Sequence, residues 1–363
     1  MDVHFWKGKK VLVTGHTGFK GSWLSLILQQ LEADVTGVSL PPETTPNLFE
    51  ASNCEDGMVS IYQDLRDAQK VTALFQEHQP EIVFHLAAQA LVRRSYDCPV
   101  ETYETNVMGT LHVLEAIRNT NSVRAAVIVT SDKCYENLEQ LQGYVETDAM
   151  GGYDPYSSSK GCVELLTSSY RNSYFPSANY NTHKTAIATA RAGNVIGGGD
   201  WSEDRLVPDV LGAFAKNETV HLRSPSAIRP WQHVLEPLVG YLCLANRLHV
   251  DGDEFAEPWN FGPDACDAKP VDWVVKNLAD LWGDGAGWGV DGENHVHEAH
   301  YLKLDCAKAK TRLDWIPRWA LLEALERIVQ WHKKFDSGED AKQLCLLQIQ
   351  EYLELVGQCY SEK

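Results

Sequence analysis

A glycine-rich turn between a short apolar run and a helical segment constrains the fold more than any other feature. The turn, TGHTGFKG, places Gly15, Gly18 and Gly21 between Lys10–Thr14 and Gly21–Leu31. The apolar run is typical of a buried parallel strand, and the periodicity of the second segment predicts a helix. Gly15 permits a tight turn, Gly18 allows a diphosphate to approach the backbone, and Gly21 allows close packing of helix and strand. A helix N-terminus offers free N–H donors, so the turn predicts a dinucleotide site.

Strands and helices are expected to alternate through the first half of the chain, which predicts an α/β fold with a Rossmann-type doubly wound parallel sheet. The expected strands are Lys10–Thr14, Asp34–Ser39, Ser60–Gln63, Glu81–Ala88, Ala125–Ser131 and Thr185–Arg191. The expected helices are Gly21–Leu31, Ala68–Glu77, Pro99–Thr120, Tyr156–Ser173, Leu321–Lys334 and Asp340–Val356. The pattern changes after about Asn194. We therefore expect a dinucleotide-binding domain over residues 1–193 and a smaller mixed α/β substrate domain over 194–363, partly interleaved with the first.

Charge and cysteine content exclude several other classes of protein. The formal net charge of -18 disfavours nucleic acid, whose phosphates an acidic surface repels. The nine cysteines are scattered, with no CxxC pair and no His/Cys cluster of the kind that binds zinc, so we expect reduced thiols and no metal. The N-terminus resembles no signal peptide, and no apolar run has the length of a membrane span. These features predict a soluble cytoplasmic protein.

The choice of dinucleotide depends on the charges near the second strand. An acid that would bind the adenosine ribose is expected near Ser39, and none stands there. No Lys or Arg occurs between Gly21 and Leu65, so a 2′-phosphate would meet only Lys20, which favours NAD over NADP. Asp64 and Leu65, after the third strand, are expected beside the adenine, although a helix-capping or turn role for Asp64 is an equal alternative. The other cofactor-binding candidates of the loop are His16, Phe19 and Lys20, with His16 expected to fill the loop rather than to catalyse.

Tyr156 and Lys160 form the most informative pair of polar residues. Positions i and i+4 lie on one face of a helix, where an ammonium can favour the ionised form of a phenol. Such a phenol can take a proton from a sugar alcohol while a nearby cofactor takes the hydride. The spacing alone is a weak signal, but the dinucleotide-binding turn strengthens it. Ser131, Asp132 and Lys133 follow the fifth expected strand and join the pair as catalytic candidates.

Together these motifs resemble a known enzyme family. TGHTGFKG, HLAA at His85–Ala88, the strand-end TSDK and the Tyr156/Lys160 pair are similar to the extended short-chain dehydrogenase/reductases. AAQALVRRSY, TSDKCY, RAGNVIGGGDW and RPWQHVLEP narrow the resemblance to nucleotide-sugar 4,6-dehydratases, most of all to those acting on CDP-glucose. The resemblance implies NAD held through the cycle, CDP-4-keto-6-deoxyglucose as product, and supply of dideoxy sugars for bacterial surface polysaccharide. It also implies a homodimer built on a four-helix bundle, with a homotetramer open.

The resemblance assigns roles to the catalytic candidates. Tyr156 would deprotonate the C4 hydroxyl, while Lys160 would lower the pKa of the phenol and hold the nicotinamide ribose. Ser131 would bind the C4 oxygen. Asp132 would protonate the departing C6 hydroxyl, a role that separates dehydratases from epimerases, which tend to have a small residue there. A strand-end hydroxyl and a turn aspartate are the structural alternatives for the last two.

The remaining candidates concern binding. The resemblance places Asn194 and Arg229 on the substrate diphosphate, with Arg205 in a similar role and Arg93 framing the pocket. A surface ion pair is the alternative for Arg229 and Arg205. Leu86, Ala87 and Ala88 would meet the cofactor. Trp201, Trp231 and His85 are expected to pack, and Asn106 to brace the sheet. An NAD-dependent epimerase, a dehydratase for another nucleotide and an inert NAD-binding regulator remain alternative functions.

Lys133 departs from the dehydratase pattern, in which glutamate acts as the base at C5. An ordinary lysine is protonated at neutral pH and cannot accept a proton. Either burial lowers its pKa, or it stabilises an enolate while another group moves the proton. If Lys133 is the base, Lys133→Met should abolish exchange of the C5 proton with solvent, measured across pH. Exchange at the wild-type rate would reject this role.

Overall fold

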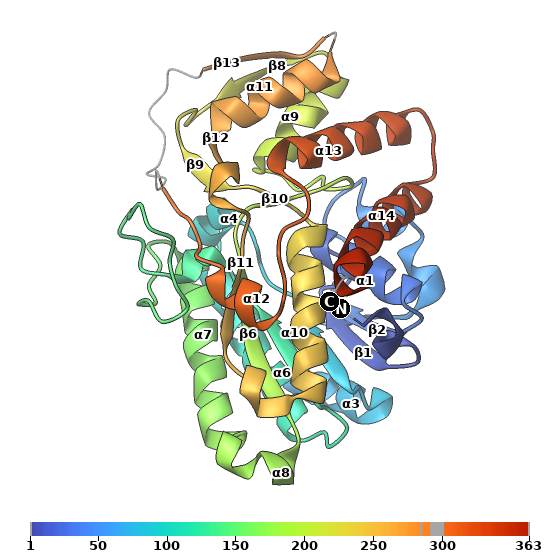
Figure 1. Cartoon of the computed structure of the whole chain (residues 1–363), viewed down its shortest axis with the longest axis vertical. Helices are drawn as coiled ribbons and strands as arrows, with labels where there is room; N and C mark the ends of the chain where they lie inside the picture. Colours follow the sequence, from blue (N-terminus) through green and yellow to red (C-terminus); the bar gives the residue numbers. More distant parts are fainter. Residues whose placement is uncertain (1, 284, 291–300, 362–363) are drawn as a thin grey trace.

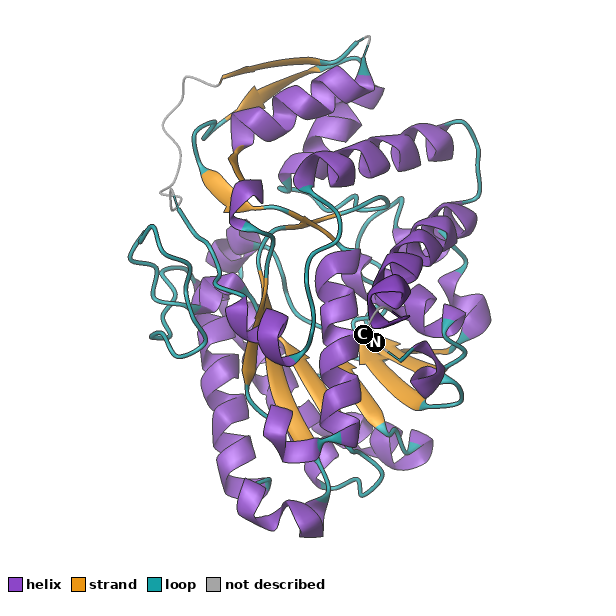
Figure 2. Cartoon of the chain, viewed as in Figure 1, coloured by secondary structure: helices purple, strands orange, loops and turns teal. Residues whose placement is uncertain are grey.

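A sheet of seven parallel strands forms the centre of the protein (Figure 2). The computed structural model describes residues 2–283, 285–290 and 301–361. The strand order is β11-β6-β5-β4-β1-β2-β3, and every neighbouring pair is parallel. The order reverses between β1 and β4, where the connections diverge and leave a crevice at the carboxyl ends of the strands. The strands are β1 (Lys10–Thr14), β2 (Asp34–Ser39), β3 (Val59–Tyr62), β4 (Ile82–His85), β5 (Ala125–Val129), β6 (Ala186–Ala192) and β11 (Pro258–Phe261).

Helices cover both faces of the sheet because side chains alternate along each strand. Val11 and Val13 of β1 share one core with Trp23, whereas Leu12 between them shares another with Phe75. The first core belongs to α1 (Phe19–Gln30), α10 (Leu235–Val250) and α14 (Ala341–Ser361), and the second to α3 (Ala68–His78), α6 (Gly109–Arg118) and α7 (Pro155–Tyr174). Figure 1 shows α14 in red running beside α1 in blue. The predicted α/β doubly wound sheet is thus confirmed.

A second group of elements lies beyond the carboxyl edge of the sheet (Figure 1). Its core joins α9 (Leu206–Ala215), α11 (Val271–Trp282) and α13 (Leu321–Asp336) to the strand β8 (Thr219–Leu222). Small paired strands complete it: β13 (Gly287–Val290) with β8, β7 (Val195–Ile196) with β10 (Gln232–His233), and β9 (Ile228–Pro230) with β12 (Ala268–Pro270). The remaining α-helices are short: α2 (Leu48–Ala51), α4 (Val92–Asp97), α5 (Pro99–Tyr103), α8 (Tyr180–His183) and α12 (Ala307–Arg312). The single helical turns are η1 (Val3–Trp6), η2 (Cys54–Gly57), η3 (Glu104–Met108), η4 (Asp132–Cys134), η5 (Ser177–Asn179), η6 (Gly252–Phe255) and η7 (Ala265–Asp267).

Two expected elements need correction. The fourth strand is β4, shorter than the expected Glu81–Ala88, because the chain leaves the sheet after His85 to pass the glycine-rich turn. The expected helix Pro99–Thr120 is α5 and α6 joined by the π-helical turn η3. Within η3, Asn106 accepts a hydrogen bond from the Gln89 amide at 2.8 Å and donates to Ser159 Oγ at 2.8 Å. Asn106 therefore braces the loop after β4 against α7 instead of the sheet itself, and π turns of this kind often occur near functional sites.

The chain returns to the sheet after the change of pattern at Asn194. Helix α10 packs on the same face as α1, and β11 adds the seventh strand beside β6. Neither element was predicted, because α10 is apolar on almost every side and β11 has only four residues. A continuous apolar run does not distinguish a buried helix from other buried segments by its periodicity.

The eight cysteines whose side chains the structure describes are free thiols, and the Cys359 side chain lies outside that description. Within the described ranges, no group of His, Cys, Asp and Glu side chains could hold a metal ion. Among the described helices, none combines the length and the apolar character needed to cross a bilayer.

A buried ion pair joins α7 to the sheet. Glu164 of α7 and Arg191 of β6 are 5% and 3% exposed, with 2.8 Å between Oε2 and Nη2. Thr130 and Thr189 donate hydroxyl hydrogen bonds to the two Glu164 oxygens at 2.5 and 2.7 Å. Arg191 also donates to Tyr135 Oη at 2.7 Å. Each charge is therefore paired and hydrogen bonded, which is the condition under which burial of a charge is tolerated.

Removing one partner should leave an uncompensated buried charge. We expect Glu164→Leu to lower the free energy of unfolding by about 3–5 kcal/mol, measured by urea denaturation. The control is Lys7→Leu, which breaks an ion pair with Glu32 whose side chains are 69% and 66% exposed. That change should cost less than about 1 kcal/mol. Equal losses in the two variants would contradict a special contribution from the buried pair.

Candidate active site

A large cavity follows the carboxyl edge of the sheet, with the second group of elements as its opposite wall. Its volume is about 2230 Å³. Ordinary small-molecule pockets occupy about 300–1,000 Å³, so this cavity has room for two ligands side by side. The glycine-rich turn lines one end, and β8 and β9 line the other. The cavity thus occupies the crevice at the carboxyl ends of the strands.

The three glycines of the turn differ in what they accommodate. Gly15 has a φ of +76°, and a Cβ on it would lie 2.7 Å from the Ala87 amide nitrogen. A Cβ on Gly21 would lie 2.0 Å from the Gly15 carbonyl oxygen. At Gly18 the nearest atom would be 3.4 Å away, so space remains on the cavity side. Gly15 and Gly21 therefore allow the backbone to close, and Gly18 leaves the start of α1 open to an anion.

The other loop side chains point in different directions. His16 is fully buried, with its Nε2 2.8 Å from Ser60 Oγ, and burial lowers its pKa to about 4. It fills space behind the loop and does not line the cavity. Phe19 and Lys20 do line it, but the Lys20 ammonium donates to Tyr241 Oη at 2.9 Å on α10. Lys20 thus lies toward Lys160, Arg205 and Asp132, whose charges shift its pKa.

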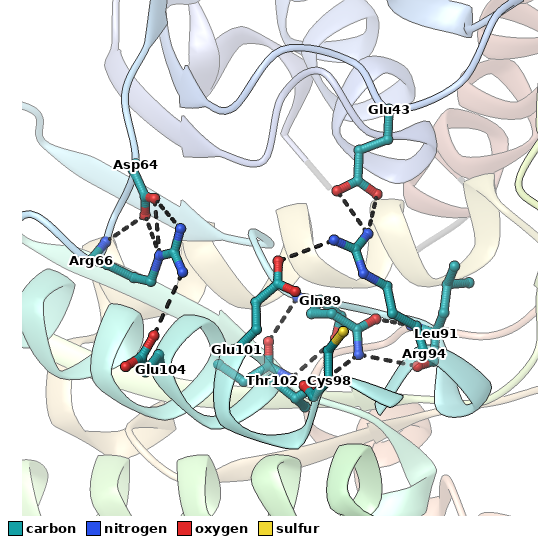
Figure 3. Close-up of polar contacts among 11 residues, drawn as sticks. Glu43, Asp64, Arg66, Gln89, Leu91, Arg94, Cys98, Glu101, Thr102 and Glu104 are labelled. Carbon is teal, nitrogen blue, oxygen red and sulfur yellow. Dashed lines mark hydrogen bonds and ion pairs between the residues drawn. The ribbon is translucent and has the colours of Figure 1, made fainter. Parts of the chain in front are cut away.

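Two arginines are paired with acids in the loops that follow β2 and β3 (Figure 3). Arg66 forms a bidentate pair with Asp64, at 2.6 and 2.9 Å to the same carboxylate oxygen. Arg94 donates to Glu43 at 3.1 Å and to Glu101 at 3.0 Å (Figure 3). Asp64, Leu65, Glu43 and Arg94 all line the cavity. The Arg66 guanidinium lowers the pKa of the Asp64 carboxyl.

These pairs correct the argument that only Lys20 could meet a 2′-phosphate. Arg94 is distant in sequence from β2, yet the fold brings it to the loop that follows that strand. Both arginines are neutralised by carboxylates, so the preference for NAD remains consistent with the charges present. The cavity-lining Glu43, four residues beyond Ser39, also supplies an acid that we did not predict.

Tyr156 and Lys160 lie together in the first turns of α7, with Asp154 as the N-cap. Both side chains are buried, at 8% and 5% exposed, and both line the cavity. Lys160 donates to the Val129 carbonyl at 3.2 Å, and burial lowers its pKa to about 8. Burial raises the pKa of Tyr156 to about 12. This direction is opposite to the lowering of the phenol's pKa that was expected from Lys160.

Ser131, Asp132 and Lys133 follow β5 and reach the same cavity. Ser131 Oγ donates to Asp132 Oδ1 at 3.0 Å and accepts from the Lys133 amide at 3.2 Å. Asp132 is 2% exposed, and burial raises the pKa of its carboxyl. A Cβ on Gly193 would lie 2.8 Å from Asp132 Oδ2, so Gly193 keeps the space for this carboxyl. Sequence reasoning did not single out Gly193, because only the fold brings the two together.

The predicted substrate-binding residues lie around the far end of the cavity. Arg205 pairs with Asp200 at 3.0 Å, and Arg93 pairs with Asp204 at 2.6 Å. Arg229 of β9 is only 6% exposed and donates to the Ile228 carbonyl at 2.9 Å. Asn194 follows β6, and its carbonyl accepts from the Gln232 amide at 3.1 Å. All four line the cavity, as does Arg223, which was not predicted.

The residues expected to pack do so. Trp201 lies against Trp331, with 5.8 Å between ring centroids, and Trp231 donates to the Lys269 carbonyl at 3.0 Å. His85 is 2% exposed and lies between two threonine hydroxyls, at 2.7 Å from Thr14 and 2.9 Å from Thr110.

Sequence comparison relates this cavity to a family of sugar-nucleotide enzymes. The model of the GDP-mannose 4,6 dehydratase family matches residues 12–241, which run from β1 into the first half of α10. The chain belongs to this dehydratase family. It is 55% identical to a CDP-glucose 4,6-dehydratase of Salmonella typhimurium, over 97% of this chain and 98% of that protein. It is also 33% identical to a dTDP-glucose 4,6-dehydratase of Escherichia coli, over 89% and 92%.

Several solved structures share the fold of this chain. A UDP-glucose 4-epimerase of Stenotrophomonas maltophila has a TM-score of 0.77 at 20% identity, covering 91% of this chain and 100% of that one. A dTDP-glucose 4,6-dehydratase of Bacillus anthracis, in complex with NAD, has a TM-score of 0.73 at 20% identity, covering 93% and 100%. At these identities the likeness concerns the fold alone.

Lys20 should make the stability of this dehydratase-family protein depend on pH. Burial, with Lys160 and Arg205 nearby, lowers the Lys20 pKa from 10.5 to about 7. Above that pH the unfolded chain binds the proton that the folded chain has lost, so the free energy of unfolding should rise with pH. In Lys20→Met this rise should be smaller, measured by urea denaturation from neutral to alkaline pH. Lys7→Met, at a largely exposed lysine, should match wild type; identical slopes in all three proteins would contradict the prediction.

Proposed function

We propose that the protein converts CDP-glucose to CDP-4-keto-6-deoxyglucose by an intramolecular oxidation and reduction that uses tightly held NAD. The proposal depends above all on one observation: a buried acid, Asp132, shares the cavity with Tyr156 and Lys160. An oxidation at C4 alone does not require that acid, whereas elimination of the C6 hydroxyl does. The 55% identity to a CDP-glucose 4,6-dehydratase supports the same choice.

The residues of the glycine-rich end fit a dinucleotide. Gly15 and Gly21 close the turn, Gly18 leaves the N-terminus of α1 accessible to the diphosphate, and the β4 end presents Leu86, Ala87 and Ala88. We assign the adenine end to Asp64 and Leu65, and the nicotinamide ribose to Tyr156 and Lys160. When bound, NAD would accept a hydride from C4 of the sugar and return it to C6.

The protein's own residues would then handle the protons. Tyr156 would remove the proton of the C4 hydroxyl, with Ser131 bound to the same oxygen. A ketone at C4 makes the C5 proton acidic, and Lys133, at the cavity wall, is our candidate for the group that serves C5. Asp132 would protonate the departing C6 hydroxyl, and burial favours its protonated form.

The far end of the cavity would hold the CDP moiety. Arg229, Arg205 and Arg93 are the cations we assign to the diphosphate, and Asn194 is the neutral donor. Arginine suits this role because its guanidinium binds phosphate oxygens in pairs. Selection of cytosine over other bases is proposed only from the identity to the CDP-glucose enzyme.

We also propose that the product supplies dideoxy sugars of bacterial surface polysaccharide and that the enzyme is cytoplasmic. We propose further that residues 1–193 and 194–363 form the two domains.

We propose assembly as a homodimer or homotetramer through α5, α6 and α7. Such an interface would cover exposed side chains on and between these helices. These are Val100, Tyr103, Met108 and Leu165, exposed by 69%, 37%, 43% and 62%. Sedimentation of the purified protein as a monomer would reject this assembly.

A panel of CDP-, dTDP-, GDP- and UDP-glucose tests the proposed function. With no added electron acceptor, ketosugar should form fastest from CDP-glucose. With deuterium at C4 of CDP-glucose, the label should move to C6.

Tyr156→Phe should lower the rate of ketosugar formation by about 10²–10⁴-fold, because the variant lacks the group proposed to remove the proton of the C4 hydroxyl.

Other outcomes point to the alternatives. A label that stays on C4 indicates an epimerase, and preference for another nucleotide indicates a different 4,6-dehydratase. Failure of every nucleotide sugar to bind would favour an NAD-binding regulator. Accumulation of stoichiometric reduced nicotinamide with the deoxygenated sugar would reject an internal redox cycle.

A further inference from the structure

We propose that the ion pair of Glu43 with Arg94 sets the choice of dinucleotide, because it occupies an arginine that could otherwise bind the 2′-phosphate of NADP. Arg94 is then a latent phosphate site, and Glu43 is the residue that keeps it occupied. The inference rests on the part of the proposed function that places a dinucleotide beside the glycine-rich turn. It goes further, since that function names NAD without assigning the residues that reject NADP.

The segment after β2 is where a Rossmann fold binds the adenosine ribose. An acid there accepts hydrogen bonds from the 2′-hydroxyl of NAD, and an arginine there accommodates the 2′-phosphate of NADP. Strand β2 ends at Ser39, whose hydroxyl oxygen is 2.9 Å from that of Thr17 in the glycine-rich turn. Thr17 also donates to the Leu40 carbonyl at 2.8 Å. These contacts fix the start of the next loop to the turn, so the loop begins at the adenosine end of the cavity.

Glu43 lies on this loop and supplies the acid that Ser39 does not. It follows Pro41 and Pro42, whose rings fix their backbone φ angles and so restrict the path of the loop. The Glu43 side chain lines the cavity and is 63% exposed. A carboxylate accepts hydrogen bonds from hydroxyl groups and repels a phosphate. The position of Glu43 therefore suits NAD.

Arg94 reaches the same loop from α4 (Figure 3). Its Nη1 donates to both Glu43 oxygens, at 3.1 and 3.2 Å, and its Nη2 donates to Glu101 on α5 at 3.0 Å. Arg94 lines the cavity together with Glu43. Two carboxylates beside one guanidinium leave this group of side chains with a net negative charge. A phosphate monoester carries roughly -1.5 to -2 charges at neutral pH, so the group repels it although an arginine is present.

Arg66 has a similar arrangement but does not offer a comparable site (Figure 3). It pairs with Asp64 at 2.6 Å and lies 3.6 Å from Glu104. Because Glu101 and Glu104 are three residues apart along one helical segment, that segment supplies an acid to each arginine. Among the described residues Arg66 does not line the cavity, whereas Arg94 does. Release of Arg94 is therefore the change that could alter which dinucleotide binds.

The pair of Glu43 with Arg94 is exposed enough to be exchanged for a contact with a ligand. Their side chains are 63% and 37% exposed. Exposed ion pairs contribute little to stability, because water screens the charges. The contact of a guanidinium with a phosphate is stronger, since both partners are charged and two hydrogen bonds form in parallel. Removal of the Glu43 charge should therefore free Arg94 for phosphate without disturbing the fold.

Competition between the two dinucleotides tests the assignment. Each purified protein is incubated with an excess of NAD and NADP at equal concentrations until the bound ratio is constant. Free nucleotide is then removed by gel filtration, the protein is denatured, and the released dinucleotides are quantified by chromatography. Wild type should release almost only NAD. Glu43→Gln should raise the ratio of bound NADP to NAD by about 10–100-fold, the effect of one charged hydrogen bond gained by the phosphate. An unchanged ratio would overturn the proposal.

A double variant separates the freed arginine from the mere loss of repulsion. Glu43→Gln/Arg94→Leu also lacks the carboxylate but cannot bind phosphate through Arg94. Its ratio of NADP to NAD should therefore lie at least about tenfold below that of Glu43→Gln. Equal ratios in the two variants would overturn the role of Arg94. The control is Glu32→Gln, at an exposed acid that pairs with Lys7 before β2, and it should keep the wild-type ratio.

The outcomes also distinguish this inference from the proposed function. A gain of NADP in Glu43→Gln, in a protein that does not turn over CDP-glucose, would support the inference and reject the proposed substrate. Turnover of CDP-glucose with bound NAD, but no gain of NADP in Glu43→Gln, would overturn the inference and leave the proposed function intact.

Discussion

The buried carboxylate of Glu164 is the interaction on which the geometry of the site depends. It lies one turn after Lys160 on α7 and accepts hydrogen bonds from Thr130, beside Ser131, and from Thr189 on β6. Its ion pair with Arg191 then extends to Tyr135, just beyond Lys133. One charge thus fixes the helix with the tyrosine and lysine against the strand end with the serine and aspartate. Each charge of this network is paired at low dielectric, which favours a unique arrangement, although the buried Arg191 Nε has no hydrogen-bond partner among the described residues.

The opposite face of the sheet has a comparable buried carboxylate as an anchor. Glu236 near the start of α10 accepts the amide hydrogen bonds of Arg318 and Trp319 and the hydroxyl of Tyr352 on α14. Helix α10 also supplies Tyr241, to which Lys20 donates. The C-terminal segment is therefore tied to the sheet through the same helix that contacts the glycine-rich turn. Glu164 and Glu236 thus hold helices against the two opposite faces of the sheet, and the cofactor end of the cavity lies at the edge of that sheet.

Local patterns predicted the parts of the protein whose signals lie within a few residues of each other. The alternation of strands and helices, the glycine spacing and the Tyr156/Lys160 pair belong to this class, and each lies where it was expected. Contacts between distant segments could not be predicted. Examples are Arg94 with Glu43, Gly193 with Asp132, and Lys20 with Tyr241. The pKa of Tyr156 was misjudged for the same reason, because burial depends on the whole fold while the spacing to Lys160 depends on one helix.

A group of cations gives anionic ligands local partners in a cavity whose wall also carries acids such as Asp200 and Asp204. The chain carries a net charge of -18, yet Lys20, Lys160, Arg205 and Arg229 all line one cavity. Burial, and after it repulsion from Lys160 and Arg205, lowers the pKa of Lys20. Two diphosphates entering the cavity would relieve that repulsion. Each ligand therefore reduces the cost of keeping the site charged, and the same cations that oppose one another in the free protein favour anion binding.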